Sequence, residues 1–151
     1  MTMQRWRFSA GAGLLVVLLA SAALPAVAAE DSDVVYYRQL AMKQLDAESE
    51  ALGMLVSGQM PPDTMVALTR AIANSAKVAA KTFELKVPGG DAKPEVFAAK
   101  WADFTSRMQQ FVKKSDEMAK VAESGNVPKI TELMVDALPC KQCHDLYRKK
   151  K

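Results

Sequence analysis

Apolar residues recur at alternating steps of three and four along most of the chain after residue 30, and no stretch alternates with a period of two for long. This spacing is typical of amphipathic helices that bury one side in a core. One unbroken line of such residues precedes Gly125: Phe97, Trp101, Phe104, Met108, Phe111, Ser115, Met118 and Ala122. The pattern predicts an all-α protein.

Turn-forming residues divide this pattern into four segments. Breaks at Gly58 with Pro61-Pro62, at the VPGGD run of 87–91, and at Gly125-Asn126 leave predicted helices over about 32–57, 63–86, from Pro94 to the third break, and 127–149. Because the loops are short, we predict an antiparallel up-down-up-down four-helix bundle. Pro139 lies inside the last segment, where a lost backbone hydrogen bond should kink or break the helix.

The first 29 residues have the features of an export signal. Arg5 and Arg7 precede an apolar run from Leu14 to Leu24, and small residues follow up to Ala29. A membrane anchor is the alternative, but an uninterrupted span needs about 20 apolar residues and this run is shorter. We expect cleavage after Ala28 or Ala29, an exported product in the periplasm, and one helical domain over 30–151.

The charge of the chain has to be counted on that product. Two of the 20 basic residues precede Glu30 and none of the 17 acidic residues does, so the cleaved chain carries a net charge of +1. This balance argues against a nucleic-acid-binding protein, and no later segment is apolar enough to span a membrane.

The chain contains two cysteines and one histidine, and they form the run Cys140-Lys141-Gln142-Cys143-His144. C-x-x-C-H is the attachment signature of c-type haem. Two thiols one helical turn apart can form thioethers to one porphyrin, and the adjacent imidazole can bind the iron from the same side. We therefore predict one covalent haem c near the C-terminal helix, held through Cys140 and Cys143, with His144 as the proximal axial ligand.

Three other interpretations of the motif are weaker. A thioredoxin-like redox pair belongs in a strand-rich βαβ unit, whereas this chain shows only helical patterning. A structural zinc site needs four ligands, and the motif provides three. A plain disulfide leaves the neighbouring histidine unexplained.

The predicted first helix offers a second axial ligand. Met42 lies on the inner line of that helix, four residues after Arg38. An arginine on an otherwise apolar line needs an anionic partner, and a haem propionate would be one. A thioether opposite His144 would give low-spin His/Met ligation, although a methionine at helical spacing is more often core filler. We expect Gln39 and Phe83 to contact the haem as well.

These residues resemble the class II c-type cytochromes, the cytochrome c′ family. The likeness rests on Tyr37-Arg38-Gln39 with Met42, on the GGDAKPEVF run of 89–97, and on Cys140 to His144 with the continuation Asp145-Leu146-Tyr147-Arg148. It implies that Arg38 meets a propionate, that the residue at 42 faces the distal side of the haem, and that Arg148 lies beside the haem.

The family that this chain resembles has two branches, which differ in the residue on the distal side of the haem. Family members with a coordinating methionine are six-coordinate electron carriers, and Met42 places this chain in that branch. We therefore expect a periplasmic electron-transfer cytochrome with His144/Met42 ligation. The alternative is a five-coordinate cytochrome c′ that binds nitric oxide or carbon monoxide at a vacant distal site.

Expected partners follow from charge and from the resemblance. Lys141 and the run 148–151 (RKKK) form a basic cluster that could steer an acidic redox protein, or could only solvate the chain end. The resemblance also suggests a homodimer through the first two helices. A haem enzyme is not expected, because peroxidase chemistry needs a distal general acid/base and the chain has no second histidine.

Overall fold

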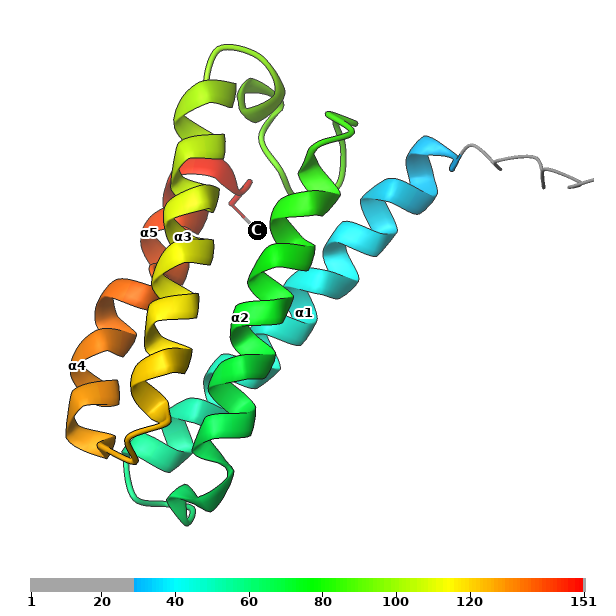
Figure 1. The fold of residues 1–151 in the computed structure, drawn as a ribbon. Coiled ribbons are helices and arrows are strands. Elements are labelled where there is room, and N and C mark those ends of the chain that lie inside the picture. The colour runs from blue at the N-terminus through cyan, green and yellow to red at the C-terminus, as the bar shows by residue number, and fades with distance from the viewer. Residues whose placement is uncertain (1–28, 151) are drawn as a thin grey trace, which may run out of the picture.

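The computed structural model describes residues 29–150, and helices make up its framework (Figure 1). The predicted signal segment falls almost entirely outside these residues. The elements are the helices α1 (Asp31–Val56), α2 (Met65–Phe83), α3 (Trp101–Ala122), α4 (Val127–Ala137) and α5 (Cys140–Tyr147), with the 3-10 turns η1 (Pro62–Thr64) and η2 (Pro94–Phe97).

The helices form an antiparallel bundle around one core. Helix α2 packs against both α1 and α3, and α3 packs in turn against α4. Together α4 and α5 take the place of the fourth helix and run back along α3 (Figure 1). Helices α1 to α4 each contribute a fully buried side chain to the core, among them Leu52, Ile72, Met118 and Ile130. The predicted four-helix bundle is confirmed.

The fourth helix breaks where the proline was expected to break it. Helix α4 ends at Ala137, Leu138 and Pro139 have the non-helical ψ values 66° and 38°, and α5 begins at Cys140. Because proline lacks an N–H and restricts the residue before it, the helix stops and restarts in a new direction. The haem motif therefore lies on a separate helix of eight residues.

The third helix starts later than expected. Residues Pro94–Phe97 form the 3-10 turn η2, the backbone reverses at Ala98 (φ −127°, ψ −111°), and α3 begins only at Trp101. The amide of Lys100 donates to the carbonyl of Glu95 at 2.9 Å and closes this bend. Val96 is fully buried in the bend, so burial of an apolar side chain takes precedence over helical continuity.

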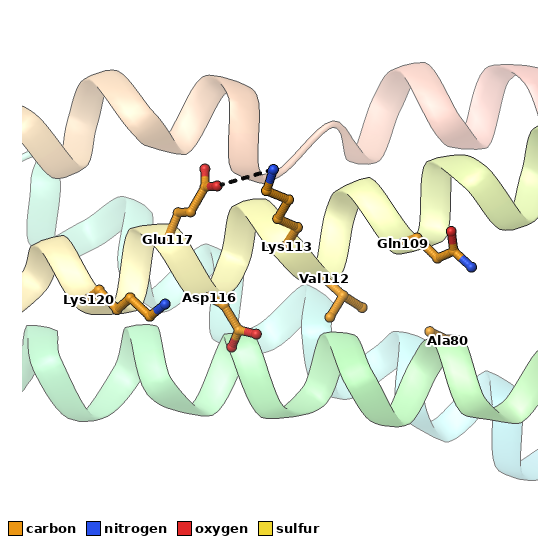
Figure 2. Close-up of a pocket in the computed structure, with 7 residues that line it drawn as sticks. All are labelled: Ala80, Gln109, Val112, Lys113, Asp116, Glu117 and Lys120. Atoms are coloured by element: carbon orange, nitrogen blue, oxygen red, sulfur yellow. Dashed lines mark ion pairs between the residues drawn. The ribbon is translucent and has the colours of Figure 1, made fainter.

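The seam between α2 and α3 carries a shallow surface groove (Figure 2). Ala80 and Val112 line it, with charged side chains around them. The ion pair Lys77–Asp116 at 2.7 Å joins α2 to α3, and Lys113–Glu117 at 3.9 Å lies along α3; solvated pairs of this kind contribute little to stability. The side chains that line this groove do not form a recognisable binding site.

Among the described residues, no helix combines the length and apolar character needed to cross a bilayer.

Candidate functional site

The three residues of the motif lie together on α5. Cys143 is half-buried against the core, while Cys140 and His144 are exposed, and both thiols are free. The amide of Cys143 donates to the carbonyl of Pro139 at 3.0 Å, so the first turn of α5 closes directly on the break. The helix has no side-chain N-cap, and its own backbone provides little beyond two turns of structure.

Partial desolvation sets the protonation of these groups. It raises the pKa of the Cys140 and Cys143 thiols and lowers the pKa of His144, which the positive charge of Arg148 lowers further. The imidazole is therefore neutral near pH 7, as a metal ligand must be.

The loop before η2 holds the C-terminal end of α5. An isolated antiparallel bridge joins Ala92 to Arg148. In it, the Lys93 amide donates to the Tyr147 carbonyl at 2.8 Å and the Lys149 amide donates to the Asp91 carbonyl at 2.8 Å. The Arg148 guanidinium also pairs with the Asp91 carboxylate at 2.9 Å. Residues 87–93, which we call the strap, therefore position the helix that carries the motif.

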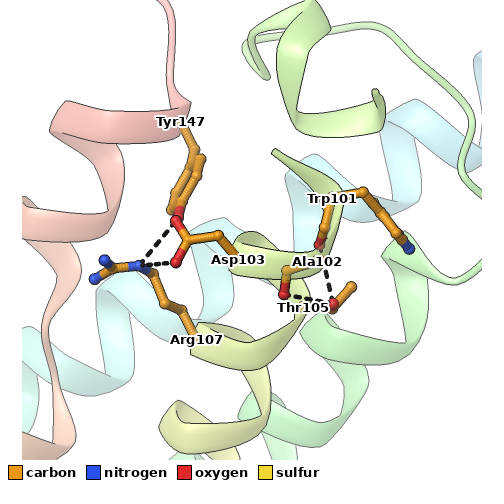
Figure 3. A network of polar contacts seen from close by, with 6 residues as sticks. All are labelled: Trp101, Ala102, Asp103, Thr105, Arg107 and Tyr147. Carbon is orange, nitrogen blue, oxygen red and sulfur yellow. Dashed lines mark hydrogen bonds and ion pairs between the residues drawn. The ribbon is translucent and has the colours of Figure 1, made fainter. Parts of the chain in front are cut away.

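A second attachment joins α5 to α3 (Figure 3). The Tyr147 hydroxyl donates to the Asp103 carboxylate, which also accepts from the Arg107 Nε at 3.2 Å. The Tyr147 ring is 5 % exposed and packs edge-on against Phe104, with 5.2 Å between the ring centroids. Tyr147 belongs to the continuation of the haem motif, and the sequence offered no signal for a hydrogen bond from it to a residue on another helix.

Arg38 is the one buried arginine of the described chain and is 4 % exposed. Its Nη2 donates to the Val87 carbonyl of the strap at 3.0 Å, and its guanidinium carbon lies 4.3 Å from the ring centroid of Phe83 and 5.1 Å from that of Phe97. Its Nε and Nη1 have no hydrogen-bond partner among the described residues. Burial lowers the pKa of this guanidinium.

This arginine tests whether a haem fits the site. A buried guanidinium with two nitrogen atoms that lack a hydrogen-bond partner is costly unless an anion meets it. A porphyrin propionate is such an anion, and it would form a charge-assisted pair of the kind arginine favours. Because the thiols and imidazole of α5 and the buried Arg38 complement the parts of haem c, the residues present fit the group.

Met42 lies on α1, one turn before Asp46. The charge of Asp46 adds to the raised pKa of Cys140, which is mainly due to burial, and opposes the lowering of the pKa of His144, so Asp46 lies within Coulombic reach of α5. Met42 itself is half-buried and packs against the core. Gln39, half-buried one turn earlier, has its Nε2 3.0 Å from the position that a Cβ on Gly90 would take, so it lies against the strap.

Comparison with known proteins gives a consistent result. The sequence profile of the family described as Cytochrome C′ matches residues 33–148. A cytochrome c′ from Alcaligenes xylosoxydans is 30 % identical over 126 residues, which cover 82 % of this chain and 98 % of the relative.

Solved structures of cytochromes c′ have a fold similar to that of this chain. A nitric oxide complex of a mutant of cytochrome c prime from Alcaligenes xylosoxidans matches with a TM-score of 0.75 and 29 % identity, covering 83 % of this chain and 100 % of the other. A carbon monoxide-bound variant from the same organism matches with a TM-score of 0.74 and 29 % identity, covering 81 % and 98 %. Cytochrome c prime from Shewanella frigidimarina matches with a TM-score of 0.72 and 25 % identity, covering 80 % and 98 %.

These relatives correct one expectation. The prediction of a low-spin electron carrier with His144/Met42 ligation is wrong, because the relatives are cytochromes c′ and two of the similar structures, both of variants from Alcaligenes xylosoxidans, hold nitric oxide or carbon monoxide. An iron bound by two side chains has no position left for a diatomic ligand. The sequence could not separate a ligating methionine from one that lines the core, and Met42 has the burial and packing of the second kind.

Proposed function

Because this chain belongs to the cytochrome c′ family, which binds covalent c-type haem, we propose that it captures nitric oxide or carbon monoxide on the haem face opposite His144. The haem supplies an iron whose sixth position can bind a diatomic gas. The single observation that carries the proposal from this chain is the buried Arg38, whose two nitrogen atoms without a hydrogen-bond partner match an anionic porphyrin edge.

Each residue of the site has a distinct part in holding the group. Cys140 and Cys143 would form the thioethers and His144 would bind the iron, all from α5. Arg38 would pair with a propionate. The Phe83 ring lies under that guanidinium and packs edge-on against Phe104, so it keeps the arginine in a dry, aromatic surrounding.

Met42 is proposed as a wall of the distal side. Its half-buried position on α1, one turn after Arg38, would put a flexible apolar side chain beside the path of an incoming gas. An apolar wall excludes water and anions while admitting small neutral molecules. Met42 would therefore select for diatomic gases by limiting space and polarity.

The test compares two methionine variants of the haem-loaded protein. In ferrous protein, Met42→Ala should raise the association rate for carbon monoxide by about 10-fold, because truncation removes much of the barrier at the distal wall. Met134→Ala, a half-buried methionine on α4, is the control and should leave the rate unchanged. A wild-type protein that ignores the gas, together with a Met42→Ala variant that binds it, would show that Met42 blocks the iron and would overturn the proposal.

The remaining expectations concern place and partners. The predicted signal segment supports export to the periplasm, where covalent haem attachment belongs. An acidic partner and a homodimer through the first two helices stay predictions. Several members of the basic cluster are engaged within the chain, since Lys141 pairs with Asp145 at 2.5 Å and Arg148 with Asp91 at 2.9 Å.

A further inference from the structure

The direction of α5 has to be set by contacts with other elements. The helix has eight residues, follows a break at Leu138 and Pro139, and has no side-chain cap at its N-terminus. A helix this short is unstable by itself, so its stability comes from tertiary packing. The residues that hold α5 therefore also determine where His144 lies.

Tyr147 attaches α5 to the rest of the molecule in three ways. Its carbonyl accepts from the Lys93 amide at 2.8 Å, its ring packs on Phe104, and its hydroxyl donates to Asp103. Tyr147 lies three residues after His144, on the following turn of the same helix. Any shift of this side chain therefore moves the turn that presents the imidazole.

The partner of the hydroxyl is itself held in place. The Asp103 side chain is 58 % exposed, and the Nε of Arg107 lies 3.2 Å from its Oδ1 and 3.3 Å from its Oδ2. The tyrosine hydrogen bond is the largest cause of the lowered pKa of Asp103, which keeps the carboxylate ionised. An ionised acceptor strengthens the hydrogen bond, and Asp103 and Arg107 both lie on the long helix α3.

We propose that Tyr147, Asp103 and Arg107 form a latch that fixes the position of α5 on α3 and thereby sets how His144 meets the haem iron. The inference rests on the proposed function only in taking His144 as the iron ligand. Residues that orient a metal ligand from outside strongly influence the properties of the metal. Tyr147 and Asp103 are thus positioning residues, and the hydroxyl of Tyr147 is the atom that closes the latch.

The test removes that one oxygen atom. In haem-loaded Tyr147→Phe the ring and its packing remain, so the fold and haem content should be unchanged. Amide exchange at Cys143 and Arg148, whose N–H groups close the two ends of α5, should become about 10-fold faster, the loss expected for a hydrogen bond to a charged group. The reduction potential should rise, because a looser imidazole stabilises ferric iron less. Tyr36→Phe, on a 59 % exposed side chain of α1, is the control and should change neither property.

A second variant checks that the effect passes through Asp103. Asp103→Ala should reproduce both changes, and adding Tyr147→Phe to it should change little more, since the two substitutions remove the same contact. Unchanged exchange or an unchanged potential in Tyr147→Phe would overturn the latch, and so would full additivity of the two substitutions. Carbon monoxide binding by the wild type is read separately. Its failure contradicts the proposed function and leaves the exchange and potential measurements intact.

Discussion

Helix α1 carries Arg38 and Met42 within 26 continuous helical residues, whereas α5 carries Cys140, Cys143 and His144 within eight. On α1 the backbone itself fixes the spacing and direction of the functional side chains. On α5 the strap and α3 have to fix them, because the helix starts anew after the proline break. The distal side of the site is therefore built by local structure, and the proximal side by contacts distant in sequence.

This difference predicts where the molecule is sensitive to change. Substitutions on α1 should act one side chain at a time, because the long helix keeps its course. Substitutions on α5, or on the segments that hold it, should act on the motif as a whole. The following changes test that comparison, from the largest expected effect to the smallest.

Loss of the α5 thiols has the largest expected effect. The double variant Cys140→Ser, Cys143→Ser keeps the size of both side chains but cannot form thioethers, so all haem should separate from the chain on denaturation. Acid extraction followed by absorbance of the protein fraction measures this, with wild type as the control that retains its colour. Haem that stays with the denatured double variant would contradict covalent attachment through these residues.

Removing the buried charge on α1 should cost less and affect one contact. Arg38→Met keeps much of the side-chain volume and should lower the free energy of unfolding of the haem-loaded protein by about 2 kcal/mol, through loss of a charged hydrogen bond. Arg70→Met is the control, because Arg70 is exposed and its ion pair with Glu123 is solvated. Equal effects in denaturant titrations would show that Arg38 has no special partner.

The strap lies between the two regions, and glycine permits its close approach to α1. Gly89 has φ +143°, and a Cβ there would lie 2.9 Å from the Val35 Cγ2. Gly89→Ala should therefore lower the free energy of unfolding by about 2 kcal/mol, from strain and overlap together. Gly58→Ala, at φ +76° with nothing within 4 Å, should cost about 1 kcal/mol. A larger loss at Gly58 in thermal unfolding would contradict this role of the strap.

The smallest effect concerns pH. The Tyr147 hydrogen bond lowers the pKa of Asp103 below its ordinary value of 3.8 in the folded protein. The resulting stabilisation is present above that ordinary value and is lost as the pH falls through the lower folded value. The melting temperature of wild type should exceed that of Asp103→Asn by a constant amount near neutral pH, and the gap should narrow below pH 3.8. A gap independent of pH would mean that the charge of Asp103 contributes nothing.

The sequence predicted more of the site on α1 than of the contacts that hold α5. Periodicity on α1 placed Arg38 inside, and the structure buries it, because helical spacing alone decides which face a residue occupies. On α5 the motif predicted the haem and Pro139 predicted the break. The attachments of Tyr147 to Asp103 and Lys93 could not be predicted, since they depend on how α3 and the strap pack against α5.

Whether Met42 binds the iron could not be predicted from the sequence, for a different reason. A methionine on an inner line has the same pattern whether its sulfur reaches the iron or only fills space. The similar structures that hold nitric oxide or carbon monoxide argue against ligation of the iron by Met42.

The most direct measurement is the absorption spectrum of the purified haem-loaded protein, ferric and ferrous, before and after addition of carbon monoxide. A gas-binding site with Met42 as its wall predicts high-spin spectra in both states and a clear shift of the ferrous bands with the gas. A low-spin spectrum with a sharp ferrous α band that carbon monoxide leaves unchanged would mean that a side chain closes the sixth position. That result would contradict the account.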